Sequence, residues 1–307
     1  MSREIKNLPH SVHVRLLRIA KENIQTFDHV FYLFALERFL YRLTKTDHAQ
    51  SFVLKGALMF LGWDLPLRRL TKDIDLQGYT ANDLENLTSI IRQVCIQPVE
   101  PDDGMTFDPQ SVAGEIIMEE ESYEGVRIRF KGYLGKAERN MQVDFSFANV
   151  ITPEAEEITY PTLLPELGMQ PFTIRGYSEE TSIAEKFQTM VDKGEINSRM
   201  KDFNDIWVMI QQCEIQGSTL VDAFINTFNS RSTAIPGETP VALTSAFADQ
   251  KSREWTIFYR KFPSPPIIHS DFQLVIEDLR DFLLPPMIAI SKGEQFDSTW
   301  YPQDGWS

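Results

Sequence analysis

Apolar residues recur at helical spacing along several stretches of the chain. Residues 11–46 keep one apolar face, and Phe31, Phe34 and Phe39 continue it in a manner typical of a buried core. The same spacing predicts further helices over 81–95, 199–213, 219–229 and 272–291. From residue 178 onward the pattern is mainly helical.

Other stretches are short and apolar or alternate between apolar and polar residues, which predicts strands. Residues 52–63 begin as a short apolar strand, turn near Gly56 and continue as a short helix. Strands are predicted over 71–79, 113–133 and 140–150, with a turn at Gly135 between the last two and shorter pieces near 158–160 and 172–175. Both periods together predict an α+β fold with a small mixed sheet.

Four prolines between residues 153 and 171 mark a change of region. We therefore predict a helical N-terminal segment over 1–50, a core over 51–176 and a mainly helical C-terminal domain over 177–307. Ser182 followed by Glu185 fits a capping box at a helix start. Residues 230–240 and 262–270 are predicted loops, and the tail after Lys292 has no clear pattern.

Three aspartates fall on two of the predicted strands. Residues two apart in a strand point to the same face, so Asp73 and Asp75 project together while Ile74 faces the other way. Asp144 lies in the later strand between two apolar residues. If the two strands are neighbours, three carboxylates converge and require protons or cations between them. Mg²⁺ suits such oxygen ligands, and two ions about 4 Å apart can serve a phosphoryl or nucleotidyl displacement. The alternative is an exposed acidic strand face.

Composition and charge narrow the class of protein. The 307 residues are 42% hydrophobic and 24% charged, as in an ordinary globular protein. We expect no signal peptide, and no apolar stretch is long enough to span a bilayer. Two isolated cysteines predict neither a disulfide framework nor a zinc site, which favours a cytoplasmic location.

The net charge of −14 argues against broad binding to nucleic acid but leaves room for a local basic surface. Arg127, Arg129 and Lys131 alternate along one predicted strand face. This stripe is either a solvated strand face or a patch that meets phosphates beside the acidic site.

Four ordered segments resemble a known family. Residues 54–58 (LKGAL) and 68–76 (RRLTKDIDL) resemble the Lys-Gly-Gly and Asp-x-Asp signatures of the AbiEii/AbiGii toxin family. Residues 182–187 (SIAEKF) and 199–207 (RMKDFNDIW) are similar to that family's Glu-Lys and Asp-x-x-Asp motifs. The resemblance covers about residues 10–285. It implies a polymerase β-like nucleotidyltransferase core with helical additions at both ends, acting as the toxin of a toxin–antitoxin or abortive-infection system.

The resemblance also assigns roles to residues. It implies that Asp73, Asp75 and Asp144 bind Mg²⁺, that Lys186 contacts the triphosphate of the NTP substrate, and that Asp202 is the acid of the last motif, with Asp205 one turn later. Nucleotide-binding roles for Lys55, Gly56, Arg69 and Thr71 follow from the first two motifs. The implied partners are an NTP, an RNA acceptor such as a tRNA 3′ end, and a cognate antitoxin.

One residue departs from the family pattern, and other interpretations stay open. Ala57 stands where the family often has a second glycine, which would weaken a phosphate cradle made by backbone N–H groups. Lys186 could equally be a solvated helix lysine, and Asp202 and Asp205 could form stabilising helix pairs. The rival functions are a nucleotide-binding interaction protein without turnover, which Ala57 favours, and a metal phosphohydrolase.

Overall fold

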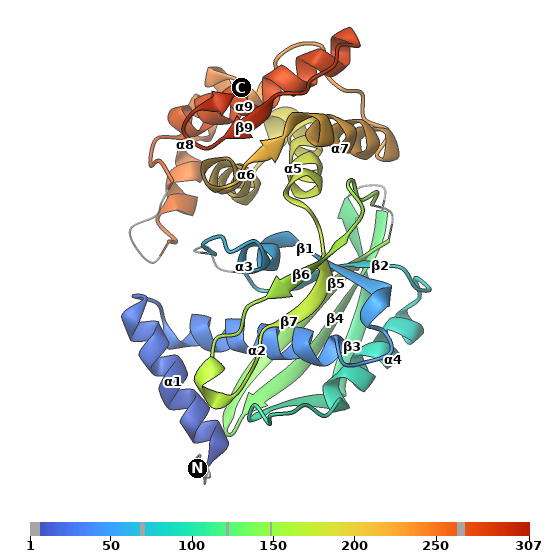
Figure 1. Ribbon diagram of the computed structural model, residues 1–307, viewed down its shortest axis with the longest axis vertical. Coiled ribbons are helices and arrows are strands. Elements are labelled where there is room, and N and C mark those ends of the chain that lie inside the picture. Colours follow the sequence, from blue (N-terminus) through green and yellow to red (C-terminus); the bar gives the residue numbers. More distant parts are fainter. Residues whose placement is uncertain (1–6, 68–70, 121–122, 148, 263–267) are drawn as a thin grey trace. The chain divides into compact units, whose positions relative to one another are not determined.

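A computed structural model describes residues 7–67, 71–120, 123–147, 149–262 and 268–307 (Figure 1). The chain forms two compact units. Unit 1 comprises Met1–Asp64, Leu70–Phe147 and Glu157–Gly176. Unit 2 comprises Leu65–Arg69, Ala148–Glu156 and Tyr177–Ser307. The division into three segments at residues 50 and 176 stays a prediction.

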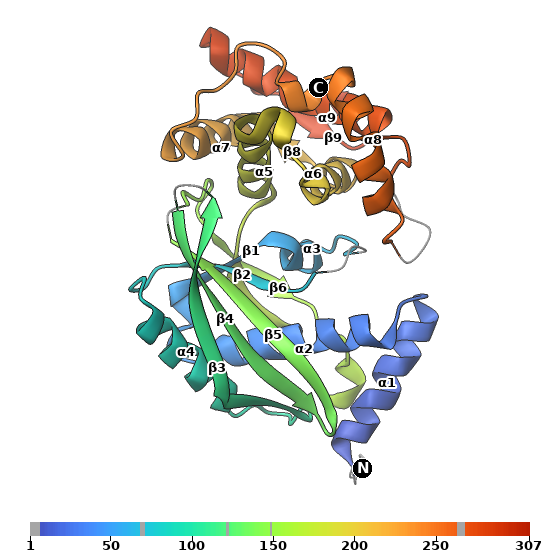
Figure 2. The ribbon, with the colours of Figure 1, turned by 180° about the vertical axis from the view of Figure 1, so that it is seen from behind.

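Unit 1 is built on a seven-stranded mixed sheet with the order β3-β4-β5-β2-β1-β7-β6. Its strands are β1 (Phe52–Lys55), β2 (Ile74–Gly78), β3 (Met105–Glu120), β4 (Tyr123–Leu134), β5 (Ala137–Ser146), β6 (Glu156–Tyr160) and β7 (Phe172–Gly176). Its helices are α1 (Leu8–Glu22), α2 (Phe27–Leu43), α3 (Met59–Gly62) and α4 (Leu84–Ile96). Helices α2 and α4 lie on one side of the sheet, as the two opposite views show (Figures 1 and 2).

Side-chain alternation in the central strands separates a core face from a polar face. Ile74 and Leu76 of β2 are fully buried, as are Val143 and Phe145 of the neighbouring β5. Strands β2 and β5 are parallel, with Ile74 opposite Val143 and Leu76 opposite Phe145. Because side chains alternate along a strand, the intervening residues of both strands share the other face.

Helix α2 is tied to the start of β3 by a buried ionic network. Arg38 donates Nε to Asp103 at 2.9 Å, and Arg42 donates to both oxygens of the same carboxylate at 2.6 and 2.9 Å. Asp103 is completely buried, and Arg38 is 1% exposed. A carboxylate and two arginines at this depth are tolerated because each has several charge-assisted hydrogen bonds.

Unit 2 is mainly helical. It contains α5 (Glu179–Lys193), α6 (Met200–Gln212), α7 (Gly217–Ser230), α8 (Ser245–Tyr259) and α9 (Phe272–Lys292). A small antiparallel sheet joins β8 (Ile215–Gln216), β9 (Thr299–Tyr301) and β10 (Gly305–Trp306). Trp300 donates its indole N–H to the carbonyl of Ile210, and Trp306 donates to that of Phe282. The C-terminal tail is therefore a packed part of this unit.

The predicted elements agree with the structure in their type, with exceptions that have local causes. The helical stretch 11–46 is two helices, because Thr26 caps the start of α2 by accepting the His29 N–H. The predicted capping box at Ser182 is wrong: α5 starts a turn earlier, and the Ser178 side chain accepts the Thr181 N–H at 3.1 Å. Glu179 and Glu180 then occupy the first turn, where they complement the helix dipole.

Other elements differ from the prediction because their apolar residues do not recur at a clear strand or helix spacing. The stretch predicted as one strand over 113–133 is the hairpin of β3 and β4, and β3 begins already at Met105. Pro109 obscured this start, and the pairing has an irregularity between Asp108 and Ala113 that accommodates it. Helix α8 and the tail strands were also not expected from the sequence.

Across the described residues, no helix combines the length and apolar character needed to cross a membrane.

Candidate active site

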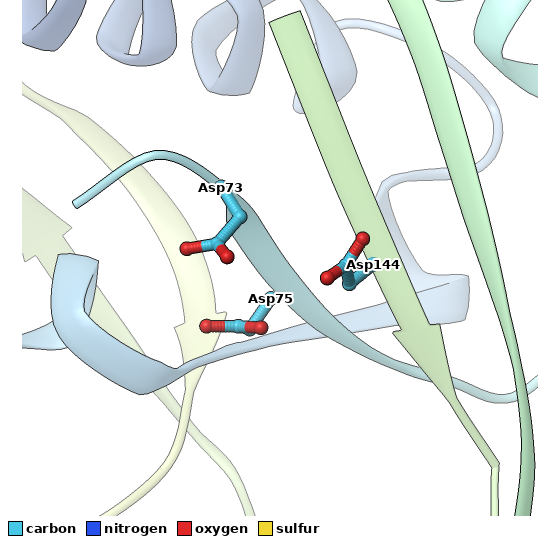
Figure 3. A group of neighbouring side chains, drawn as sticks. All are labelled: Asp73, Asp75 and Asp144. Atoms are coloured by element: carbon cyan, nitrogen blue, oxygen red, sulfur yellow. The ribbon is translucent and has the colours of Figure 1, made fainter. Parts of the chain in front are cut away.

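Three aspartates converge on the polar face of the sheet. Asp75 of β2 lies directly opposite Asp144 of β5, and Asp73 immediately precedes β2 (Figure 3). Carboxylate oxygens of the three residues lie within 4.8 Å of one another. The structure thus brings together three residues that are up to about seventy positions apart in sequence.

The two central acids belong to a charged row that crosses five strands. Register pairs connect neighbouring members of this row, which contains Lys55, Asp75, Asp144, Arg127 and Glu115. Residues directly opposite in a sheet point to the same face, so the two adjacent aspartates are flanked by Lys55 on one side and Arg127 on the other. The next row, with Leu54, Leu76 and Phe145, is buried on the opposite face.

Asp144 is closely held by Arg127, the first cation of the predicted basic stripe. Arg127 donates Nε and Nη2 to the two oxygens of Asp144 at 2.8 and 2.7 Å, and Gln142 donates to one of them at 3.2 Å. These hydrogen bonds raise the pKa of Arg127, although its partial burial lowers it. Asp144 is 4% exposed, so the guanidinium pairs with a carboxylate that has little contact with water.

The other cations of the stripe are also balanced by acids on adjacent strands. Arg129 pairs with Glu115 at 2.6 Å, and Lys131 pairs with Glu138 at 3.0 Å. All four of these side chains are substantially exposed. The stripe lies on one face as expected, but its charge is shared with neighbouring carboxylates.

A glycine turn approaches the acids from the side of β1. Gly56 follows β1 with φ +71°, a conformation that favours glycine. A Cβ atom there would lie 2.2 Å from Oδ2 of Asp75, so any larger residue would collide with the carboxylate. Ala57, the departure from the family pattern, is 3% exposed.

The remaining nucleotide-binding candidates of unit 1 lie around the same acids. Lys55 is 8% exposed and pairs in register with Asp75. The Thr71 hydroxyl donates to Oδ1 of Asp73 at 3.3 Å. Arg69 lies outside the described residues.

Tyr32 is a neighbour of the acids that no sequence pattern selects. Its hydroxyl donates to the carbonyl of Lys72, next to Asp73. Burial, together with the charges of Asp73 and Asp144, raises the pKa of Tyr32, so its phenol stays protonated at neutral pH. The aromatic pattern of α2 predicts a core residue at Tyr32 and does not indicate that it lies near the acids. Arg127 could have been found from the sequence, because pairing β4 with β5 as a hairpin places it opposite Asp144.

The candidates from the last two motifs meet within unit 2. The Lys186 ammonium lies 3.4 Å from Asp202 and 3.1 Å from Asp205, and Arg199 Nε lies 2.5 Å from Asp202. Both aspartates are completely buried. Burial alone would raise the pKa of Asp202, but the charges of Lys186 and Arg199 outweigh it and lower that pKa. Two buried carboxylates therefore position the lysine.

The three-acid cluster has the chemistry that a hard divalent cation requires. Mg²⁺ prefers oxygen ligands and is commonly held by one or two carboxylates plus substrate phosphates. Asp73 and Asp75 present such oxygens, and the Gly56 turn leaves room for the Asp75 carboxylate beside the backbone. Asp144 can bind the same cation only if Arg127 gives up at least one of its two hydrogen bonds to the Asp144 carboxylate.

Comparisons with known proteins agree with this geometry. A family model described as "Nucleotidyl transferase AbiEii toxin, Type IV TA system" matches residues 38–281. MenT4, a nucleotidyltransferase toxin from Mycobacterium tuberculosis H37Rv, is 14% identical, with 94% of this chain and 90% of MenT4 covered and a TM-score of 0.55. A candidate nucleotidyltransferase from H. pylori is 13% identical, with 88% and 100% covered and a TM-score of 0.50. No curated protein matches the sequence. At these identities the structural likenesses show the fold, which is that of polymerase β-like nucleotidyltransferases.

Proposed function

The chain belongs to the AbiEii family of nucleotidyl transferase toxins, and from this premise we propose that it transfers a nucleoside monophosphate from an NTP to an RNA 3′ end. The observation that carries the proposal is the convergence of Asp73, Asp75 and Asp144 within 4.8 Å beside the Gly56 turn. In-line transfer needs charge compensation, a phosphate cradle and a positioned nucleophile, and this face of the sheet offers groups for each.

Each residue of the site has a definite role in this proposal. Asp73, Asp75 and Asp144 would hold Mg²⁺, which would supply positive charge to neutralise the charge that develops on the transferring phosphate. The triphosphate binds near the Gly56 turn, with Lys55 and Thr71 as further contacts, and the family resemblance adds Arg69 to the nucleotide-binding residues. Lys186, positioned by Asp202 and Asp205, contacts the departing phosphates.

The reaction balances without a further reagent. The acceptor 3′ oxygen forms a bond to the α-phosphorus of the NTP, the bond from that phosphorus to the bridging oxygen breaks, and pyrophosphate leaves. Asp144 takes up the proton of the acceptor hydroxyl. Because the family model names a type IV toxin–antitoxin system, we also propose a cognate antitoxin partner and a cytoplasmic site of action.

The first prediction concerns Asp75. We expect Asp75→Asn to lower nucleotidyl transfer by more than about 100-fold, because metal ligands contribute at least as much as the outer-shell partners that cost 10–100-fold. The protein is incubated with Mg²⁺, each α-³²P-labelled NTP in turn and total tRNA, and label is followed into RNA. Asp222→Asn, an exposed aspartate on α7, is the matched control and should retain full activity.

The same assay separates the rival functions. Label that enters RNA with the unaltered protein and the control, but not with Asp75→Asn, supports the proposal. Release of nucleoside mono- or diphosphate without labelled acceptor would identify a phosphohydrolase. NTP binding without any product would identify a nucleotide-binding protein without turnover, and full transfer by Asp75→Asn would refute the site.

A further inference from the structure

A pocket of about 740 Å³ lies within unit 1, near the three aspartates. Its lining combines the first turns of α2, the segment before β2 and residues from β3, β4 and β5. Two lining residues touch the acids directly: Gln142 donates to Asp144, and Thr71 donates to Asp73. The pocket is therefore adjacent to the proposed active site and shares Thr71 and Gln142 with its surroundings.

The sheet register explains why a pocket exists here. Strand β4 pairs with β5 from Ala137 to Phe145, whereas β2 pairs with β5 only from Val143 onward. At residues 139–142, β5 therefore extends past the start of β2. Arg139, Asn140, Met141 and Gln142 all line the pocket at this place. A ligand there would lie immediately ahead of Asp73.

Two buried polar atoms of the lining have no partner in the described part of the chain. They are Nε2 of His29, a residue only 6% exposed, and Nε of Arg139. Buried polar groups usually have hydrogen-bond partners, and an unsatisfied one costs free energy. Burial lowers the pKa of His29, so its ring is neutral at pH 7 and can exchange a hydrogen bond with a ligand hydroxyl or carbonyl.

The charge of the lining favours an anionic ligand. Lys72, Arg129, Lys131 and Arg139 contribute cations, and Asp28, which pairs with Arg139, is the carboxylate among the described lining residues. Arg129 and Lys131 pair with Glu115 and Glu138, which lie outside the lining, so Lys72 and Arg139 are the cations on which the argument for an anionic ligand depends. Arg139 also lies over the Phe31 ring at 5.0 Å, which fixes the direction of its guanidinium.

The order of the strands distinguishes the two substrates. Gly56, the proposed triphosphate turn, lies on the β1 side of Asp75, whereas the pocket opens on the β5 side of the same acids. In-line displacement places the attacking group and the leaving group on opposite sides of the phosphorus. We propose that this pocket, formed by His29, Lys72, Arg139 and the open edge of β5, binds the 3′-terminal nucleotide of the RNA acceptor. This inference rests on the proposed function.

RNA binding by pocket variants tests the assignment. The probe is a short single-stranded RNA of mixed sequence with a 5′-fluorescein, and its Kd is measured by fluorescence anisotropy over a salt series. We expect Arg139→Gln and Lys72→Gln each to raise the Kd about tenfold at low salt and to reduce the salt slope by about 0.7, the value for one lost phosphate contact to a single strand. Binding of a fluorescent NTP analogue should stay within about twofold.

Matched controls separate a pocket from general electrostatics. Arg92→Gln removes the same charge from an exposed position on α4 outside the pocket, and it should leave both the Kd and the salt slope unchanged. His29→Phe keeps the ring but removes the nitrogen, and it should weaken RNA binding without altering the salt slope. An RNA of the same sequence that carries the fluorescein on an internal base can be closed into a circle, and the circle should bind more weakly than its linear form because it has no 3′ end.

Several outcomes would overturn the proposal. Equal effects of Arg92→Gln and Arg139→Gln would show that only net charge matters, and equal binding of circular and linear RNA would exclude recognition of an end. Loss of NTP binding with intact RNA binding would make this the nucleotide pocket, and label that enters protein in place of RNA would exclude an RNA acceptor. If Arg139→Gln lowers the melting temperature, its weaker RNA binding could come from partial unfolding. The RNA affinity of Lys72→Gln, a change at an exposed position, then tests the pocket.

The experiments distinguish refutation of the acceptor pocket from refutation of the proposed nucleotidyl transfer. Transfer that depends on Asp75 but is insensitive to the pocket variants would refute the pocket alone. RNA binding that depends on the pocket, with no transfer by the unaltered protein, would refute the proposed function alone.

Discussion

The contact between Asp144 and Arg127 limits how this aspartate can bind a metal ion. The residue has the position expected of a third metal ligand, yet both of its oxygens accept hydrogen bonds from Arg127. An arginine at this place compensates the same negative charge that a cation would compensate. The two cannot both bind the carboxylate fully, so metal affinity and protein stability are linked through this pair.

We therefore predict that Arg127→Gln makes stability more dependent on Mg²⁺. Without the ion, the buried Asp144 loses its partner, which should lower the free energy of unfolding by about 1–3 kcal/mol. Added Mg²⁺ should restore more stability in the variant than in the unaltered protein, because a competing cation is gone. Urea unfolding with and without Mg²⁺ measures both effects.

Arg129→Gln is the matched control for this experiment. Arg129 and Glu115 are both about half exposed, so loss of that pair should cost less than about 1 kcal/mol. The response of this variant to Mg²⁺ should equal that of the unaltered protein. An identical Mg²⁺ response in Arg127→Gln would show that Asp144 does not contribute to cation binding.

At the scale of elements, α2 supports both the core and the candidate site. Its aromatic residues Phe31, Phe34 and Phe39 are fully buried, which confirms the predicted core stripe. Its first turns carry His29 and Tyr32 into the pocket. Its last turns are fixed to the start of β3 through Arg38, Arg42 and Asp103. Correct placement of α2 is therefore a condition for the geometry of the site.

Removal of the buried carboxylate should test this support. We expect Asp103→Asn to lower the free energy of unfolding by about 3–5 kcal/mol, because two buried arginines would lose their anionic partner. Urea denaturation followed by circular dichroism measures the change. Asp47→Asn, at an exposed position after α2, should change stability little. A loss below about 1 kcal/mol in Asp103→Asn would mean that the network does not fix α2.

At the scale of the whole molecule, the charged motif residues divide between two compact units. Unit 1 contains the three aspartates and the glycine turn, and unit 2 contains Lys186 with its two acidic partners. The resemblance to the family assigns a role in nucleotidyl transfer to residues of each unit.

Hydrogen exchange can test whether unit 1 binds the metal ion and whether Lys186 of unit 2 contacts the nucleotide. We predict that Mg²⁺ alone slows amide exchange in β2 and β5 but not in α5 and α6, because the three-acid cluster lies in unit 1. Mg²⁺ with an α,β-methylene NTP analogue should slow exchange in both sets, because Lys186 then holds the phosphates. Asp75→Asn should abolish both effects. Protection that never reaches α5 would exclude the proposed role of Lys186.

Local patterns in the sequence were enough to find most elements and the family. Helix α9 was predicted over 272–291 and spans Phe272–Lys292, because its apolar face repeats over many turns. Helix α8 was missed because only Phe247, Ala248, Lys251 and Trp255 of its fifteen residues are buried, so its period is weak. The tail strands are two and three residues long and carry no period at all.

The sequence by itself determined which residues could carry the chemistry. Strand alternation requires Asp73 and Asp75 to share a face, a turn was required at Gly56, and the ordered motifs identified the family. The tertiary structure alone decided that β2 pairs with β5 in the register that places Asp75 opposite Asp144. It also decided that Arg127 holds Asp144, that two acids hold Lys186, and that an open strand edge forms a pocket. These features depend on contacts between distant segments, and a shift of one residue in register would turn every side chain to the other face.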